Sequence, residues 1–453
     1  MLSRSRILLF ITITLSCLAA AAQAETKDQR PNIVYILADD LGYGDLGCYG
    51  QKMIATPNID RLAQEGMKFT QHYAGNAVCT PSRSSLLTGK HPGNVRHRDN
   101  PRFVDSYGFL PQETTFAEAM KEAGYATAIT GKWHVGDRND TEDIAPYHGF
   151  DYNYCVGFPY PEGGVEHWPS HLFENGKMVK IPENQNGQRG AYMDDLYTDA
   201  AIRFLNERDN EKPFILFLSF QGVHVPMDGK ISPDYANKDW PEVEKVFASM
   251  LQNLDTNTGR FLKELETQGL AKNTVVFFTS DNGPHLEGGH DHRFFNSNGP
   301  LRGAKRDLLE GGIRVPLIVR WPDIVPQHSQ SDHVSAFWDM LPTFVDIAGE
   351  PLPADTDGIS FLPTLTGNKQ EKHAFLYWEN QEYGGQQAVL ENDWKLYRKG
   401  IIDNSNAEWE LYNITSDPAE LHDIASKYPQ VVRQLSRRAS DSHTPSPIAP
   451  LFK

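Results

Sequence analysis

Acidic side chains follow two apolar runs of the sequence. Asp39 and Asp40 come just after the run at residues 32–37, and Asp281 and Asn282 come directly after the run at residues 274–280. Two adjacent aspartates repel each other unless a cation lies between them. Three carboxylates and one amide offer only oxygen ligands, which select Ca²⁺ or Mg²⁺ rather than zinc. The pattern predicts one hard-cation site. The alternative is a helix cap at Asp40 and a simple turn at Asp281.

A cysteine opens a segment rich in serine, CTPSRSSLLTG, at residues 79–89. Pro81 is typical of the first turn of a helix. A cysteine just before a helix N-terminus has a stabilised anion, and Arg83 beside it would hold an oxyanion. The segment predicts a reactive residue at position 79. The alternative is a buried cysteine and a surface arginine.

The elements that must position these residues alternate along the chain. Apolar runs typical of buried strands lie at residues 32–37, 125–130, 213–220, 274–280 and 315–320, and helical spacing lies at residues 57–66, 115–124 and 243–269. Such strands joined by helices predict a large mixed, mostly parallel sheet sandwiched by helices. Ligands of such sheets bind beyond the carboxyl ends of the strands, where Asp39 and Asp281 are expected.

The pattern changes near Pro351-Leu352-Pro353. Shorter strands rich in aromatic residues follow at 374–379, 387–390, 394–398 and 408–412, without long helices between them. This arrangement predicts an antiparallel sheet. We therefore predict an α/β catalytic domain over residues 25–350 and a small α+β subdomain over residues 351–453.

The first 24 residues have the features of a secretory signal peptide. Arg4 and Arg6 precede an apolar or small stretch over residues 7–22, and Ala22-Gln23-Ala24 offers a small-x-small cleavage site. We expect an exported protein, periplasmic or secreted. The stretch is short for a membrane span and no later run is long enough for one, so no span is expected.

The net charge limits the classes of binding partner, and the cysteine count limits the number of disulfides. Cleavage would remove two arginines and no acids, which takes the net charge from −16 to −18 and argues against nucleic acid and anionic membranes. Only Cys48, Cys79 and Cys155 would remain, too few for a disulfide framework. A disulfide between Cys48 and Cys155 and two buried free thiols both stay open, and the thiols are favoured.

The segment Cys79-Thr80-Pro81-Ser82-Arg83, continuing to Leu87-Thr88-Gly89, resembles the signature of type I sulfatases of the alkaline phosphatase superfamily. The resemblance extends from about Pro31 to about Tyr412. Other segments match the family in order: Asp39-Asp40, Gly131-Lys132-Trp133-His134, His224-Val225-Pro226, Asp281-Asn282-Gly283, Gly303-Ala304-Lys305-Arg306 and Gly311-Gly312-Ile313-Arg314-Val315-Pro316. The resemblance implies an alkaline phosphatase-like fold.

The resemblance also implies a modified residue and a metal ion. Cys79 would be oxidised to formylglycine (3-oxoalanine) by a formylglycine-generating enzyme, and its hydrated form would be the nucleophile. One Ca²⁺, or alternatively Mg²⁺, would be held by Asp39, Asp40, Asp281 and Asn282 together with residue 79.

Five further residues receive catalytic roles from the resemblance. Arg83, Lys132 and Lys305 would neutralise the charge that develops on the sulfate. His224, with Lys305, would protonate the leaving oxygen, and His134 would deprotonate the second hydroxyl of the sulfated intermediate.

Substrate recognition is assigned to charged and aromatic loops that lie close in sequence to these segments. They would contact sugar hydroxyls or a second anionic group, and the alternative is solvated surface charge or ordinary core packing. The residues are His97, Arg98, Asp291, His292, Arg293 and, in the aromatic loop 151–173, His171.

Together these features predict a sulfuric-ester hydrolase that removes sulfate from a sulfated carbohydrate. One alternative is a phosphoester or phosphonate hydrolase of the same superfamily, although no obvious second set of metal ligands is present. The other is a non-catalytic sulfated-glycan binding protein.

Overall fold

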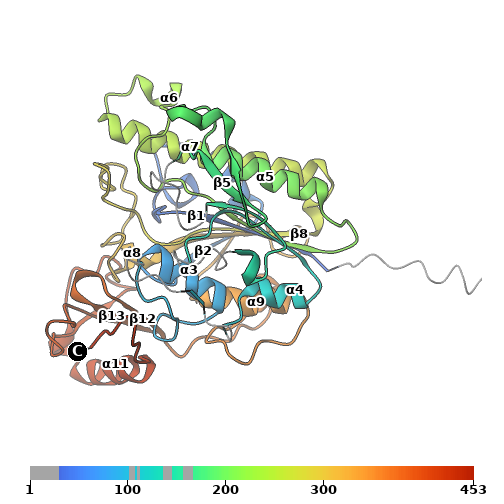
Figure 1. Cartoon of the computed structure of the whole chain (residues 1–453). Coiled ribbons are helices and arrows are strands. Elements are labelled where there is room, and N and C mark those ends of the chain that lie inside the picture. The colour runs from blue at the N-terminus through green and yellow to red at the C-terminus, as the bar shows by residue number, and fades with distance from the viewer. Residues whose placement is uncertain (1–29, 101–107, 110–112, 136–144, 157–166, 453) are drawn as a thin grey trace, which may run out of the picture.

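The computed structural model describes residues 30–100, 108–109, 113–135, 145–156 and 167–452. The predicted signal peptide lies outside the described residues, as does part of the aromatic loop. A large sheet lies between two layers of helices, and a small sheet with its own helix packs at one side of the molecule (Figure 1).

The large sheet has the strand order β10-β2-β9-β8-β1-β7-β3-β4-β5-β6, and β11 pairs with β2. Its strands are β1 (Asn32–Ala38), β2 (Met67–Tyr73), β3 (Ala126–Lys132), β4 (Tyr152–Val156), β5 (His171–Glu174), β6 (Lys177–Lys180), β7 (Phe214–Ser219), β8 (Thr274–Ser280), β9 (Arg314–Arg320), β10 (Ser329–Ser331) and β11 (Ser335–Ala336).

The centre of this sheet is parallel. Strands β3, β7, β1 and β8 are neighbours, and each pairs in parallel with the next. Strand β9 runs antiparallel to both β8 and β2. Every residue of β1, β7 and β8 is buried, as expected for strands covered on both faces. The predicted mixed, mostly parallel sheet is confirmed.

Helices cover both faces of the large sheet. Helices α5 and α7 lie on one face, and α3, α4 and α9 lie on the other (Figure 1). The helices are α2 (Pro57–Gln64), α3 (Cys79–Thr88), α4 (Phe116–Glu122), α5 (Met193–Glu207), α6 (Pro233–Ala236), α7 (Glu242–Thr267), α8 (Glu310–Ile313), α9 (Met340–Ile347), α10 (Leu362–Leu365) and α11 (Pro429–Ser442).

Short 3₁₀ helices complete the connections. They are η1 (Gly47–Tyr49), η2 (Ala145–His148), η3 (Pro182–Gly187), η4 (Ala271–Asn273), η5 (Phe337–Asp339), η6 (Glu382–Gly384) and η7 (Ala425–Lys427).

The predicted antiparallel sheet follows near the end of the chain. Strands β12 (Leu376–Asn380), β13 (Gln386–Glu391), β14 (Trp394–Lys399) and β15 (Glu410–Asn413) pair in sequence order, and α11 packs against β12, β13 and β14. Phe361 and Leu365 still belong to the core beneath the large sheet, and the domain boundary at residue 350 stays a prediction. None of the described helices has the length and apolar character needed to cross a bilayer.

Buried charges join the two sheets. The Lys395 ammonium of β14 lies 2.8 Å from a Glu310 oxygen of α8 and 3.1 Å from a Glu420 oxygen, and all three side chains are fully buried. Desolvation raises the pKa of Glu420 to about 7, although Lys395 opposes the shift. This contact places the small sheet against the end of the large one where α8 precedes β9.

Candidate functional site

The candidate site lies at the carboxyl edge of the four central parallel strands. Asp39 follows β1 and Asp281 follows β8, and the last residues of these strands, Ala38 and Ser280, are register partners. Lys132 is the last residue of β3. The expectation that the two acidic pairs meet at one sheet edge is therefore met by the geometry.

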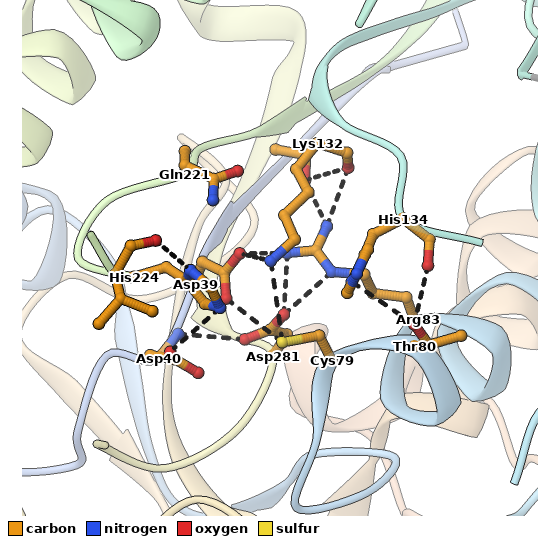
Figure 2. A network of polar contacts seen from close by, with 12 residues as sticks. Asp39, Asp40, Cys79, Thr80, Arg83, Lys132, His134, Gln221, His224 and Asp281 are labelled. Carbon is orange, nitrogen blue, oxygen red and sulfur yellow. Dashed lines mark hydrogen bonds and ion pairs between the residues drawn. The ribbon is translucent and has the colours of Figure 1, made fainter. Parts of the chain in front are cut away.

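Cys79 is the first residue of α3 and lies inside this cluster (Figure 2). Its Sγ is 3.5 Å from Asp39 Oδ1 and 3.8 Å from Lys132 Nζ. Burial raises the pKa of the Cys79 thiol well above its usual range, and Asp39 raises it further. Desolvation thus opposes the thiolate that the helix N-terminus would stabilise, and the reactive anion at position 79 stays a prediction.

Arg83 lies one turn further along α3 and connects the acids. Its side chain is 1% exposed. One guanidinium nitrogen is 2.8 Å from Asp281 Oδ2 and 3.4 Å from Asp39 Oδ2, and another donates to Ser219 Oγ at 2.7 Å. A buried arginine of this kind requires such partners. It lies where an anion brought to Cys79 would meet a fixed cation.

Two buried lysines add positive charge at opposite sides of the acids. Lys132 Nζ contacts Asp39, and Lys305 Nζ is 2.8 Å from Asp40 Oδ2. Burial alone would lower the lysine pKa values, but Asp39 and Asp40 respectively outweigh it and raise them. Gly131, at φ 120°, lets β3 reach this position, because a Cβ there would lie 1.8 Å from the Ser219 carbonyl oxygen.

The oxygen-rich centre of the cluster fits a hard cation. Ligand atoms of Asp39, Asp40, Cys79 and Asp281 all lie within 4.8 Å of one another. Asn282 donates to Asp40 Oδ1 at 2.7 Å, and its own buried Oδ1 has no hydrogen-bond partner among the described residues. An unpartnered amide oxygen beside three carboxylates is a donor set suited to Ca²⁺ or Mg²⁺.

The three carboxyls differ in proton affinity. Desolvation would raise the pKa of all three. The charges of Lys305 and His224 outweigh desolvation at Asp40 and lower its pKa to about 2. The charges of Lys132 and Arg83 likewise lower the pKa of Asp39. For Asp281, desolvation and the charge of Asp39 prevail over Arg83 and raise the pKa to about 6. Asp281 is thus the carboxyl of this set that most readily takes up a proton.

A second group of potential ligands comprises Asp40, His285 and Glu287, whose ligand atoms lie equally close together. The Lys305 ammonium already lies between two of them, 2.8 Å from Asp40 Oδ2 and 3.0 Å from Glu287 Oε2. Lys305 neutralises this group in the structure, and the expectation of a single metal ion stays a prediction.

Two histidines flank the cluster on different sides (Figure 2). His224 Nε2 is 3.8 Å from Asp40 Oδ2, and burial, with Lys132 and Lys305, lowers the His224 pKa well below its usual range. His134 has φ 57° and accepts a hydrogen bond from Thr80 Oγ1 through its carbonyl oxygen at 2.9 Å. Non-glycine residues in this region are strained, and Asp40, at φ 62°, is another.

Gln221 and Asp194 belong to the site but carry no motif that identifies them in the sequence. The Gln221 carboxamide is fully buried near Lys132 and His224, and neither of its polar atoms has a hydrogen-bond partner among the described residues (Figure 2). Asp194, from the first turn of α5, accepts the backbone N–H of Gln221 at 2.8 Å and of Gly222 at 3.0 Å. Asp194 therefore holds the segment that leads to His224.

A cavity of about 990 Å³ opens beside His224. Its walls come from three separate segments, at residues 168–170, 184–189 and 224–228, together with Gly288. The middle segment lacks a repeated pattern or a charge cluster, so the sequence offered no signal for it.

The structure places His97 and Arg98 away from this cavity wall. His97 is 1% exposed, with Nδ1 3.1 Å from Ser84 Oγ. Arg98 is 3% exposed and donates to the carbonyl oxygens of Val95 and Gly93, and it contacts Glu379 of β12. This differs from the expected sugar contact of Arg98, because the guanidinium is buried where the loop meets the small sheet.

The other expected recognition residues lie at the surface or next to the cavity. Arg293 and Asp291 are partners of each other, 2.7 Å apart, and line none of the cavity. His292 is half-buried, and burial lowers its pKa. His171 lies on β5 beside the cavity residue Ser170, 3.0 Å from its Oγ. Their roles stay predictions.

The three cysteines that the structure describes, Cys48, Cys79 and Cys155, are unpaired. Cys48 and Cys155 are free and belong to hydrophobic cores on opposite faces of the large sheet. The favoured expectation of two free thiols is confirmed.

Comparison with known proteins identifies related chains. The family model "Sulfatase" matches residues 31–350, and the model "N-sulphoglucosamine sulphohydrolase, C-terminal" matches residues 302–444. The chain is 31% identical to an N-acetylgalactosamine-6-O-sulfatase of Bacteroides thetaiotaomicron, over 90% of this chain and 92% of the relative. It is 34% identical to human steryl-sulfatase, over 77% and 72%. It also resembles the crystal structure of Ps i-CgsB in complex with k-i-k-neocarrahexaose, with TM-score 0.78, 28% identity and coverage of 92% and 94%.

Proposed function

The chain belongs to the sulfatase family and is a sulfuric-ester hydrolase, and from this premise we propose that it removes sulfate from a sulfated carbohydrate by means of a formylglycine at position 79 and one divalent metal ion. The observation that carries the proposal is the position of Cys79. It begins a fully buried helix and faces Asp39, Lys132 and Arg83 in one cluster.

The metal would be held by Asp39, Asp40, Asp281 and Asn282 together with residue 79. The carboxylate oxygens of Asp39, Asp40 and Asp281 and the Asn282 Oδ1, which has no hydrogen-bond partner among the described residues, support Ca²⁺, with Mg²⁺ as the alternative. When bound, such a cation supplies Lewis acidity to a sulfate oxygen and to the residue-79 hydroxyl.

The modified residue would supply the nucleophile. A hydrated formylglycine carries two hydroxyls on one carbon, so one can attack sulfur and the other can later release the sulfate. A formylglycine-generating enzyme would read the Cys79-Thr80-Pro81-Ser82-Arg83 segment during maturation, before α3 is packed. Every residue of α3 is buried in the folded chain, which agrees with modification of the unfolded segment.

Three fixed cations would bind and orient the sulfate. Arg83 and Lys132 lie on one side of the acids, and Lys305 lies on the other. In the unliganded cluster each one contacts an aspartate, so the aspartates hold the cations in place and the cations stay charged while buried. A sulfate monoester carries one negative charge spread over three oxygens, and these donors would stabilise that charge as it shifts during S–O cleavage.

The proton transfers would fall to residues at two sides of the cluster. His224 and Lys305, which both lie beside Asp40, would together give a proton to the leaving sugar oxygen. Burial lowers the pKa of His224, so Lys305, whose pKa Asp40 raises, is the partner that stays protonated before the substrate binds. Asp281, the carboxyl with a pKa of about 6, would take the proton of the attacking hydroxyl. His134, next to Thr80, would take the proton of the second hydroxyl.

The sugar substrate and the location follow from different arguments. A relative named N-acetylgalactosamine-6-O-sulfatase and a similar structure in complex with k-i-k-neocarrahexaose support a sulfated sugar. The basic and apolar start of the chain supports export to the periplasm or the medium.

The proposal is tested by sulfate release from a panel of sulfated mono- and oligosaccharides, with the corresponding phosphate esters in parallel. We expect release from at least one sulfated sugar, loss of release in Cys79→Ala, and loss on chelation that Ca²⁺ restores. Turnover of phosphate esters with no sulfate release would contradict the proposal.

A further inference from the structure

The cavity beside His224 is lined by loop segments that are joined to one another by hydrogen bonds. We propose that this cavity is the glycan-binding site of the enzyme and that Arg189 selects substrates that carry a second anionic group, a carboxylate or a second sulfate, near the sulfate ester that is cleaved. This inference rests on the proposed function, because His224 marks the end of the cavity where the leaving oxygen would lie.

The wall segment is held rigidly by Asn184, a side chain that uses all its hydrogen-bonding capacity. Asn184 is 3% exposed; its Nδ2 donates to the carbonyl oxygens of Pro169 and Ala191, and its Oδ1 accepts the N–H groups of Gly190 and Ala191. These four hydrogen bonds fix residues 184–191 relative to Pro169, so the side chains of residues 186–189 project from a fixed backbone.

Gln185 anchors the same segment to the opposite wall. Its Nε2 donates to the Ser170 carbonyl oxygen at 2.7 Å and to the Ile181 carbonyl oxygen at 2.9 Å. The third wall is joined to the first by Trp168, whose Nε1 donates to the Asp228 carbonyl oxygen at 3.2 Å. The cavity is thus bounded by hydrogen-bonded loops and does not depend on a single side chain.

The exposed side chains on the wall match the groups of a sugar. Asn186 and Gln188 are exposed carboxamides, which both donate to and accept from hydroxyls. The volume of about 990 Å³ is at the upper end of the range for ligand sites, which leaves room for more than one sugar unit. A small aryl sulfate would fill only the end of the cavity at His224.

Arg189 gives the cavity its charge preference. Among the described residues that line the cavity it is the only permanent cation, and its side chain is 59% exposed. Asp228 Oδ2 lies 3.4 Å from its Nη2. Because the Arg189 side chain is exposed to solvent and the contact is long, this ion pair contributes little stability. The guanidinium has five donors, so it can keep one contact with Asp228 and still bind an oxyanion through two others.

The net negative charge of the whole chain gives a cation at position 189 a specific role in binding an anionic substrate. With a net charge of −16 the protein repels anions, so a polyanionic substrate needs local cations at the places where its charges dock. Arg83, Lys132 and Lys305 serve the sulfate that is cleaved. Arg189 lies at the cavity wall beyond His224, outside that cluster, where the next anionic group of a longer substrate would lie.

The test compares the wild type with Arg189→Gln, with Arg189→Lys, and with Arg260→Gln as a matched control. Arg260 is an exposed arginine on α7 that pairs with Asp199, and it does not line the cavity. Each protein is assayed on 4-nitrocatechol sulfate and on matched disaccharides. One disaccharide carries a sulfated hexosamine linked to a uronic acid, one has the carboxylate reduced to the alcohol, and one has a second sulfate in place of the carboxylate.

We expect the wild type to prefer one of the two dianionic disaccharides over the reduced one, and the better of the two identifies the second anion. In Arg189→Gln, kcat/KM for that disaccharide should fall about 10-fold or more, mostly through KM, and the fall for the reduced disaccharide should be much smaller. Arg189→Lys should recover part of the loss, because it keeps the charge without the fork. Arg260→Gln should behave as the wild type.

Two results would overturn the inference alone. One is equal turnover of charged and reduced disaccharides by the wild type, and the other is an unchanged preference in Arg189→Gln. Both require that the wild type hydrolyses 4-nitrocatechol sulfate. A wild type that carries formylglycine and hydrolyses no sulfate ester would instead refute the proposed function.

Discussion

Asp194 offers a specific test of how the His224 segment is held. Its buried carboxyl accepts two backbone N–H groups, from Gln221 and Gly222, just before His224. Asp194→Ala would leave both N–H groups buried without a partner, at a cost of about 1–3 kcal/mol each. The expected loss in unfolding free energy is therefore about 2–6 kcal/mol.

This loss corresponds to a measurable change in melting temperature. About 2.1 cal/mol/K per residue gives an unfolding entropy of roughly 0.9 kcal/mol/K for a chain of this size, so Asp194→Ala should lower the Tm by about 2–7 °C. Sulfate release should fall as well, because the His224 segment loses its support. Asp199→Asn is the matched control, since Asp199 is an exposed acid on the same helix, paired with Arg260.

The same site predicts a pH dependence of stability. Desolvation raises the pKa of Asp194 to about 7, although the N–H groups of Gln221 and Gly222 lower it. A raised carboxyl pKa means that the stabilisation is complete below the unfolded pKa of about 4 and is lost as the pH rises toward 7. The stability of the wild type relative to Asp194→Asn should therefore be greater at pH 5 than at pH 8.

Calorimetry or scanning fluorimetry at both pH values measures these effects. A Tm of Asp194→Ala within 1 °C of the wild type would refute the reasoning about the buried N–H groups. If the stability of the wild type relative to Asp194→Asn is greater at pH 8 than at pH 5, the assignment of the raised pKa is refuted.

Three further predictions concern stability. Lys395→Met leaves buried Glu420 without its cation and leaves Glu310 with Arg314 alone, and it should cost about 3–5 kcal/mol in unfolding free energy. Glu420→Gln keeps the ion pair between Lys395 and Glu310 and should cost far less; equal losses would contradict this account. Cys48 and Cys155 are free, so dithiothreitol should leave the Tm of the folded protein unchanged, and a fall would indicate a disulfide. Gln221→Leu removes a buried carboxamide that has no hydrogen-bond partner among the described residues, so it should raise the unfolding free energy by about 1–3 kcal/mol; a destabilised variant would disprove this.

The sequence predicted the parts of the site that depend on local pattern and strand order. Apolar runs identified β1 and β8, and the acids beyond them had to meet once the strands were neighbours in a parallel sheet. Cys79 could be placed at a helix entry because Pro81 and the serines mark one. A short motif does not reveal burial, which raises the pKa of the Cys79 thiol and opposes the anion that the motif predicts.

The rest could not be predicted because it depends on contacts between distant segments. Arg98 looks like a loop charge in the sequence, yet its partner Glu379 is 281 residues away. The cavity wall at residues 184–189 joins residues 168–170 through backbone carbonyls, which carry no sequence signal. Asp194 lies on an ordinary amphipathic helix, and only the tertiary fold places it under the His224 segment.

Mass spectrometry of the peptide that contains residue 79, on protein from the native host, tests the central claim most directly. The account predicts a peptide mass about 18 Da below that of the cysteine form, with sulfate release that rises in proportion to the converted fraction. An unmodified Cys79 in protein that releases sulfate at full rate, or full release by Cys79→Ala, would contradict it.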